Sequence, residues 1–283
     1  LIAAGSNAFL NWVLIYGHLG MPRLEVEGAA YATIIAKTVE MLLLIGYTIK
    51  ERPEFISFSV FKRIDWALFG RILKKGSLLI MSQMMWVLSE SFTAAIYNGR
   101  GNAAVVSGMA ASFSIANLFF ISFDGITTAT GVLIGKSLGR NELEDARKEK
   151  TWMLSAAIIF GCIMCLVGVV TVLLVPVVFG NLSIDAQNIC RAMLLLMALF
   201  MPLWTFVNTQ LAVCRAGGDT KVGFLVDGGT TAVMIPMLLI LAFFTNASPV
   251  MMYFGVKALD VGKIIVATHE MKKERWVVNL SNA

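Results

Sequence analysis

Charged residues are scarce in this chain. Only 14% of its 283 residues are Asp, Glu, Lys or Arg, whereas 58% are hydrophobic. A soluble domain usually carries about a quarter charged residues, so the polar surface here is too small to cover a soluble core of this size. The composition excludes an ordinary soluble protein and predicts an all-α polytopic membrane protein.

Histidine and cysteine are also rare, with two and four copies. Cys162 and Cys165 lie within the apolar run FGCIMCLVGVV, whereas a zinc or redox site needs loops and partner ligands. His18 and His269 stand alone in the sequence. We therefore expect no metal centre at these residues.

A signal peptide is not evident either. The chain begins at Leu1, inside the apolar segment LIAAGSNAFLNWVLIYG, without the basic stretch and cleavage site of a secretory signal. We interpret the sequence as an N-terminally truncated chain. A processed mature protein is the alternative, but a cut inside a membrane helix is hard to make.

Apolar stretches of about 20 residues, the length of a membrane-crossing helix, recur along the chain. One partial and seven complete spans are predicted. They cover residues 1–18 (partial), 28–48, 76–97, 103–134, 152–179, 186–214, 222–244 and 250–268. Between the second and third spans, Phe61, Ile64, Leu68 and Ile72 recur at helical spacing, which predicts an amphipathic helix lying on the membrane.

Basic residues are distributed unevenly between alternate loops. Lys and Arg number seven in residues 49–75, five in 136–150, two in 215–221 and three in 272–275, whereas the intervening connections hold three. Cytoplasmic loops are enriched in Lys and Arg, so the rich side, which includes the C-terminus, is predicted to be cytoplasmic. No folded basic surface for nucleic acid is indicated.

Four stretches resemble parts of multidrug and toxic compound extrusion (MATE) transporters, in the family's order and at its spacing. The join between the family's fifth and sixth helices is matched by LIYGHLGMPRLEVEGAAYATIIAK, and the loop after its eighth helix by GVLIGKSLGRNELEDARK. The loop between its tenth and eleventh helices is matched by CRAGGDTK, and the C-terminal tail of one bacterial branch by KKERWVVNL. The resemblance covers essentially the whole chain.

The resemblance implies twelve helices in two six-helix bundles. Residues 1–48 would hold part of helix 5 and helix 6, at the end of the N-terminal bundle, and residues 49–75 the cytoplasmic amphipathic linker. Residues 76–270 would form the complete C-terminal bundle, helices 7–12, and residues 271–283 a cytoplasmic tail. Helices 1–4 would be missing, with an Asp that many prokaryotic members link to coupling, so the chain alone is expected not to transport.

The resemblance also implies an antiporter of the plasma (inner) membrane, monomeric when complete, that uses no cofactor and is not an enzyme. It would export cationic or amphiphilic small molecules in exchange for Na⁺ or H⁺ by alternating access. Two alternatives stay open: a flippase for a lipid-linked or amphipathic substrate on a related two-bundle fold, and a non-transporting remnant. Basic residues lining the cavity would favour the flippase. The mid-membrane acids Glu90 and Asp124 have no lysine close in sequence, which favours the exporter.

Charge inside a bilayer costs about 2.5 kcal/mol or more, so each charged residue in a span marks a functional hypothesis. Glu90 shares a helix face with Gln83 and Trp86. Some sodium-coupled family members have a Glu at the matching position, which works with an Asp whose place is taken here by Trp204. We predict that Glu90 binds the coupling ion or substrate. The alternative is a carboxylate buried in the bundle, neutral or bonded to nearby serines.

Further polar side chains extend this predicted cavity. Thr205 and Asn208 follow Trp204 and offer neutral oxygens for a cation. In the span 103–134, a polar stripe falls within about a third of a turn, and it predicts a wet face with Asn117 and Asp124 lining the cavity. Hydrogen bonding between helices is the alternative role. The stripe consists of Ser107, Ser114, Asn117, Asp124 and Thr128.

Two predicted spans carry a similar charged pair. Lys37 and Glu40 are three residues apart in the second span, and Lys257 and Asp260 repeat this spacing in the last. Opposite charges at this spacing can neutralise each other along a helix. The pairs are predicted to be structural pins that fix each terminal helix to its bundle. Alternatively, they line the cavity and exchange partners with protons or substrate. A third acid, Asp227, is predicted to anchor the start of its helix.

Overall fold

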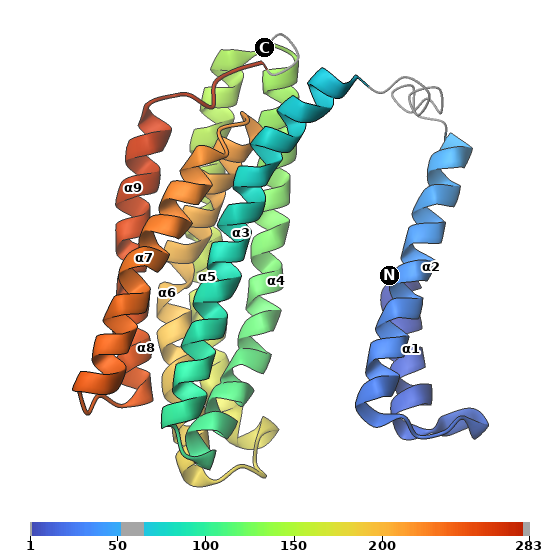
Figure 1. Ribbon diagram of the computed structural model, residues 1–283, viewed down its shortest axis with the longest axis vertical. Coiled ribbons are helices and arrows are strands. Elements are labelled where there is room, and N and C mark those ends of the chain that lie inside the picture. The colour runs from blue at the N-terminus through green and yellow to red at the C-terminus, as the bar shows by residue number, and fades with distance from the viewer. Residues whose placement is uncertain (1, 52–64, 280–283) are drawn as a thin grey trace. The chain divides into compact units, whose positions relative to one another are not determined.

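The computed structural model describes residues 2–51 and 65–279, and every regular element in these ranges is a helix (Figure 1). The chain divides into two compact units at the boundary between Trp66 and Ala67. The first unit holds α1 (Ile2–Tyr16), the short 3₁₀ helix η1 (His18–Gly20) and α2 (Glu25–Glu51). The second unit is built from α3 (Trp66–Arg100), α4 (Ala103–Gly139), α5 (Leu143–Val178), α6 (Ile184–Ala216), α7 (Lys221–Phe244), α8 (Pro249–Ala258) and α9 (Asp260–Lys272).

Six helices of the described chain, α2 to α7, are long and apolar enough to cross a membrane. The predicted class, an all-α polytopic membrane protein, is therefore confirmed. The last predicted span differs from the expectation, because the helix is divided at Leu259 into α8 and α9. Around this residue the backbone bonds close over three residues, from Leu259 N–H to Val256 and from Gly262 N–H to Leu259, which is 3₁₀ geometry.

In the first unit, α1 and α2 form a helical hairpin that packs through small residues. Gly28, Ala32 and Ala36 are buried and follow each other at intervals of four on α2. A Cβ atom at Gly28 would lie 2.7 Å from the Leu14 carbonyl group, so only glycine permits this approach of the two backbones. The adjacent Lys37 and Glu40 pair with each other at 2.7 Å, with side chains 74% and 42% exposed, and their role as a structural pin stays a prediction.

In the second unit, α6 is the central helix and packs against α4, α5, α7, α8 and α9. The closest approaches again occur at glycines. A Cβ atom at Gly108 of α4 would lie 2.5 Å from the Ala186 carbonyl oxygen, and one at Gly161 of α5 would lie 2.5 Å from Pro202 Cα. Met193, Met197 and Met201 of α6 are almost fully buried, so these methionines serve packing.

The third predicted span starts earlier than expected. Helix α3 begins at Trp66 and not at Gly76, so the end of the predicted surface linker 49–75 is the first part of a long helix. Residues 52–64 of that linker, including Phe61 and Ile64, lie outside the described residues. For residues 52–64 the assignment to an interfacial helix stays a prediction.

The C-terminal tail is folded back onto the end of the second unit. The Trp276 side chain is buried, and its indole N–H donates to the Met271 carbonyl oxygen at 3.3 Å. Arg147 of α5 bonds the Glu274 carboxylate at 2.8 Å and holds the pKa of this group below its usual range. Glu274 has a φ of 51°, which an L-residue rarely adopts. The tail thus ties α9 to α5.

Gly217, directly after α6, provides the space for this tail. A Cβ atom there would lie 1.8 Å from the Trp276 carbonyl oxygen. Gly217→Ala is expected to push the tail off its seat and to cost about 1–3 kcal/mol. Thermal unfolding of the purified protein and trypsin cleavage after Arg275 measure both effects. Gly135→Ala, where a Cβ meets open space, is the control. Equal melting temperature and cleavage rate in the two variants would contradict the assignment.

Candidate functional site

The second unit encloses a cavity of about 810 Å³, which we call the bundle cavity. Helices α3, α4, α6, α7, α8 and α9 all contribute to its walls. Its polar and charged lining residues are Gln83, Glu90, Asn117, Asp124, Thr127, Asn208, Arg215, Asp227, Lys257, Asp260 and Lys263, and its aromatic ones are Trp86, Phe113, Phe120, Phe123, Trp204 and Tyr253. A volume of this size suits a drug-sized ligand.

Helix α3 contributes the face that the sequence predicts. Gln83, Trp86 and Glu90 all line the bundle cavity. The same helix is held to α7 by polar side chains. Ser82 donates to the Asp227 carboxylate at 2.5 Å, and Ser89 donates to the Met234 sulfur at 3.1 Å. The polar residues of α3 therefore divide between the cavity wall and the contact with α7.

Glu90 is paired with a lysine from the far end of the chain. Lys257 Nζ of α8 donates to Glu90 Oε1 at 2.6 Å, and the two side chains are 13% and 30% exposed. The predicted pairing of Lys257 with Asp260 is therefore wrong in this structure. Glu90 and Lys257 are 167 positions apart in the sequence but in direct contact, so the lack of a lysine close in sequence did not mean that Glu90 lacks a lysine partner.

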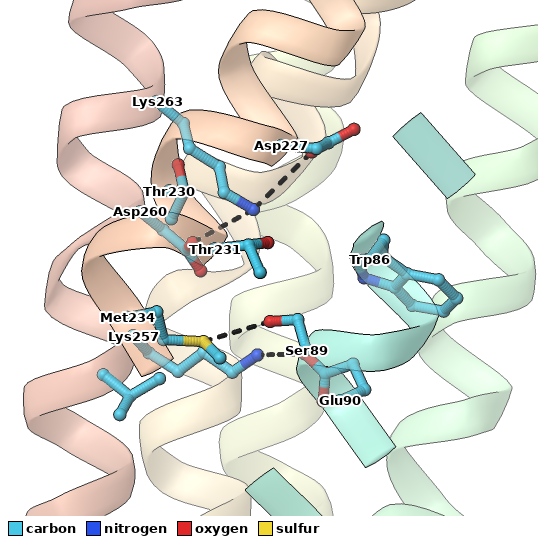
Figure 2. Close-up of a pocket in the computed structure, with 11 residues that line it drawn as sticks. Trp86, Ser89, Glu90, Asp227, Thr230, Thr231, Met234, Lys257, Asp260 and Lys263 are labelled. Carbon is cyan, nitrogen blue, oxygen red and sulfur yellow. Dashed lines mark hydrogen bonds and ion pairs between the residues drawn. The ribbon is translucent and has the colours of Figure 1, made fainter. Parts of the chain in front are cut away.

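Asp260 instead belongs to a second cluster (Figure 2). The Trp204 indole N–H donates to Asp260 Oδ2 at 2.8 Å, and Lys263 Nζ lies 3.3 Å from Asp260 Oδ1. Figure 2 shows the Lys263 side chain reaching between Asp260 and Asp227, and its ammonium is 3.8 Å from Asp227 Oδ1. Two carboxylates thus share one lysine inside the bundle.

Asp227 is a site residue that sequence reasoning placed wrongly. It does not cap or anchor the start of α7, because that helix begins at Lys221 and Asp227 contacts Ser82 and Lys263 in the interior. Lys263 was not predicted as a site residue. Its spacing of three from Asp260 was a signal available in the sequence.

Helix α4 confirms part of the predicted stripe. Asn117 and Asp124 line the bundle cavity, and Thr127 lines it where Thr128 was expected. Ser107 and Ser114 lie outside the lining, and the Ser114 hydroxyl donates to the Ala110 carbonyl oxygen of its own helix. Asp124 is exposed to the cavity, and it has no ion pair among residues 2–51 and 65–279. This carboxylate is therefore open to a ligand.

Helix α6 presents Trp204, Asn208 and Arg215 to the bundle cavity. Thr205 is fully buried and does not line the bundle cavity. Its hydroxyl donates to the Met201 carbonyl oxygen and faces α5, where a Cβ atom at Gly161 would lie 2.3 Å from it. Thr205 therefore does not complete a cation site with Glu90. Arg215 was not predicted as a site residue, and its buried Nε has no hydrogen-bond partner within the described part of the chain.

Two aromatic rings flank the Lys257 ammonium. Its Nζ lies 5.6 Å from the ring centroid of Trp204 and 5.4 Å from that of Tyr253. Both distances are within the range of a cation–π interaction. A carboxylate and two rings thus surround one positive charge on the wall of the bundle cavity.

Comparison with known families decides the identity of the chain. The family model described as MatE matches residues 79–240, which is more than half of the chain. This chain belongs to the MATE family. The resemblance seen in the sequence is thereby confirmed, and the family consists of transporters and not of enzymes.

Curated MATE relatives have similar sequences over most of this chain. The probable multidrug resistance protein NorM of Mesorhizobium japonicum is 26% identical over 97% of this chain, which spans 60% of that protein. NorM of Brucella suis is 27% identical over 91% of this chain and 56% of its own length. The chain therefore spans somewhat more than half the length of the curated MATE relatives it matches.

Solved MATE structures share the fold. An outward-facing multidrug resistance MATE transporter of the MOP superfamily matches with a TM-score of 0.80 at 19% identity, covering 97% of this chain and 60% of that one. A variant of the Vibrio cholerae MATE transporter VcmN matches with a TM-score of 0.79 at 17% identity, covering 98% of this chain and 62% of that one. A third match is a MOP superfamily transporter from Pyrococcus furiosus, for which reverse polarity of the binding pocket suggests a different function. Its TM-score is 0.79 at 19% identity, and the match covers 97% of this chain and 61% of that one.

The ion pair between Glu90 and Lys257 can be tested by a double-mutant cycle on the complete gene product. Glu90→Gln and Lys257→Met each leave one charge unpaired in the bundle, so each is expected to cost about 1–3 kcal/mol. The double variant should recover at least half of the summed loss. Thermal unfolding in detergent provides the measurement.

The matched control for this cycle is the surface pair of Asp145 and Lys148, whose side chains are 58% and 65% exposed. Asp145→Asn should change stability little, because exposed ion pairs contribute at most about 1 kcal/mol. Strictly additive losses for Glu90→Gln and Lys257→Met would show that the two groups are not coupled.

Proposed function

We propose that the complete gene product exports cationic or amphiphilic small molecules in exchange for Na⁺ or H⁺. The names of the curated relatives support efflux of drugs, and the lining of the bundle cavity supports the charge of the substrate. Its four carboxylates, Glu90, Asp124, Asp227 and Asp260, outnumber the basic groups Arg215, Lys257 and Lys263. Both lysines already contact carboxylates. The net charge of the cavity lining is therefore negative.

The observation that carries this proposal is the unpaired carboxylate of Asp124, which faces the bundle cavity together with Asn117 and Trp86. An unpaired charge within a membrane protein is costly, and such groups usually serve a ligand or ion pathway. Aromatic faces next to a carboxylate are suited to an organic cation, which gains both Coulombic and cation–π attraction. Asp124 and Glu90 are the groups proposed to bind substrate or coupling ion.

Transport would follow alternating access. The two bundles of the complete protein would move against each other around the cavity, and ion binding would shift the balance between the two open states. The uneven distribution of Lys and Arg among the loops supports a multi-pass protein of the plasma membrane with a cytoplasmic C-terminus. We propose a monomer as the transporting unit.

A flippase for an anionic, lipid-linked substrate is the second candidate. Arg215 favours it, because its unpartnered Nε lines the bundle cavity. A pyrophosphate bound there would share the cavity with the Asp124 carboxylate, however, and like charges repel each other. The third candidate, a non-transporting remnant, requires a complete gene product without efflux activity.

Efflux of ethidium from cells that lack their own exporters tests the proposal. Glu90→Gln and Asp124→Asn are each expected to reduce efflux about 10- to 100-fold, the loss of one charge-assisted contact. Separate sodium and proton gradients identify the coupling ion. Asp145→Asn, on the exposed start of α5, should keep normal efflux. Normal efflux with Glu90→Gln and Asp124→Asn would remove both carboxylates from the mechanism.

A further inference from the structure

The Lys257 ammonium lies where an organic cation would gain most on binding. It contacts Glu90 Oε1 at 2.6 Å, and the rings of Trp204 and Tyr253 face it at 5.6 and 5.4 Å. All four side chains line the bundle cavity. A carboxylate flanked by aromatic faces is the combination that recognises alkylated ammonium ions. The Lys257 ammonium therefore occupies a site whose carboxylate and aromatic rings are suited to binding an organic cation.

The aromatic walls of this site are held in place without Lys257. The Trp204 indole N–H donates to Asp260 at 2.8 Å, and Phe200 stacks on the indole with ring centroids 5.8 Å apart. Tyr253 is fully buried and meets Phe113 edge to face at 6.3 Å. Both rings should keep their orientation when the ammonium leaves, which is the condition for a preformed ligand site.

A second carboxylate, that of Asp260, lies close to Lys257 along the chain. Asp260 follows it by three residues, across the turn at Leu259 where the backbone bonds have 3₁₀ geometry. Residues three apart are aligned in a 3₁₀ turn, and a lysine has a long, flexible stem. The ammonium can therefore move from Glu90 toward Asp260 and still have a carboxylate beside it in the bundle cavity.

We propose that Lys257 is a tethered competitor for organic cations at Glu90. Its ammonium fills the site when the transporter is empty, and it moves toward Asp260 when a cationic substrate binds between Glu90, Trp204 and Tyr253. This proposal rests on the proposed export of cations and adds the residue that sets their affinity. The ligand class is a monovalent organic cation with an aromatic or alkylated nitrogen.

Binding of ethidium to the purified complete gene product, followed by fluorescence anisotropy, tests the competitor. If Lys257 holds Glu90 in about nine of ten empty molecules, removing it should tighten binding about tenfold, because the apparent Kd scales with the open fraction. Lys257→Met is the test variant. Lys257→Gln replaces it if the methionine variant does not fold. Loss of a lysine that merely stabilises the protein would leave the affinity equal or weaker.

Three further variants separate competition from a change in overall charge. Lys257→Arg keeps the charge and should leave ethidium binding within about threefold of the wild type. Lys263→Met removes the same charge from the same cavity, but Lys263 contacts Asp227 and Asp260, so its gain should be clearly smaller. In the double variant Glu90→Gln with Lys257→Met, the gain should disappear.

The outcomes distinguish this inference from the proposed function. No ethidium binding by the wild type and by Lys257→Met would overturn both. Binding that depends on Glu90, with a gain under about threefold for Lys257→Met, would overturn the competitor and leave cation export standing. Equal gains for Lys257→Met and Lys263→Met would reduce the effect to the electrostatic field of the cavity and overturn the competitor as well.

Discussion

The contact between Glu90 and Lys257 is the interaction on which the second unit most depends. Either charge alone would be costly inside a membrane protein, and each neutralises the other at 2.6 Å. The pair also joins α3, the first helix of this unit in the sequence, to α8, its second-last helix. Further attachments of α3 are polar, with Ser82 bound to Asp227 and Arg100 bound to the carbonyl oxygens of Leu241 and Thr245 at the end of α7. Apolar packing adds to them, since Tyr97 of α3 is buried in the hydrophobic core and contacts the Tyr253 ring. Ion pairing and apolar packing together position the helix that carries Trp86 and Glu90.

The second charged cluster follows from the division of the last span. Because α8 ends at Ala258 and α9 begins at Asp260, Lys257 lies on α8, whereas Asp260 and Lys263 lie on α9, beyond the 3₁₀ turn. Lys257 then binds across to α3, and Asp260 binds Trp204 of α6. The family resemblance in the sequence implies that Trp204 takes the position of an Asp found in some sodium-coupled members. The cavity still has an acid beside α6, but it comes from α9, so the same charge is supplied by a different helix.

Helical periodicity predicted several, though not all, of the side chains that line the bundle cavity. Gln83, Trp86 and Glu90 on α3, and Asn117 and Asp124 on α4, line it as their spacing indicated. The partners of these groups could not be predicted, because pairing depends on contacts between distant helices, such as the 167 residues between Glu90 and Lys257. Thr205 failed for a local reason: α5 approaches α6 closely at Gly161 and takes that face of the helix. Asp227 failed because its distance from the helix start does not reveal what packs beside it.

The two lysines of the bundle cavity bear on its specificity in different ways. Lys263 is shared by two carboxylates, Asp227 and Asp260, so its removal would leave two negative charges close together. Lys257 faces one carboxylate and two aromatic rings, so its displacement uncovers a complete site for a monovalent cation. A ligand shifts a conformational equilibrium only by its differential affinity for the states. A cation that must displace Lys257 from Glu90 breaks one tie between α3 and α8 as it binds, and this links occupancy of the cavity to the packing of the helices around it.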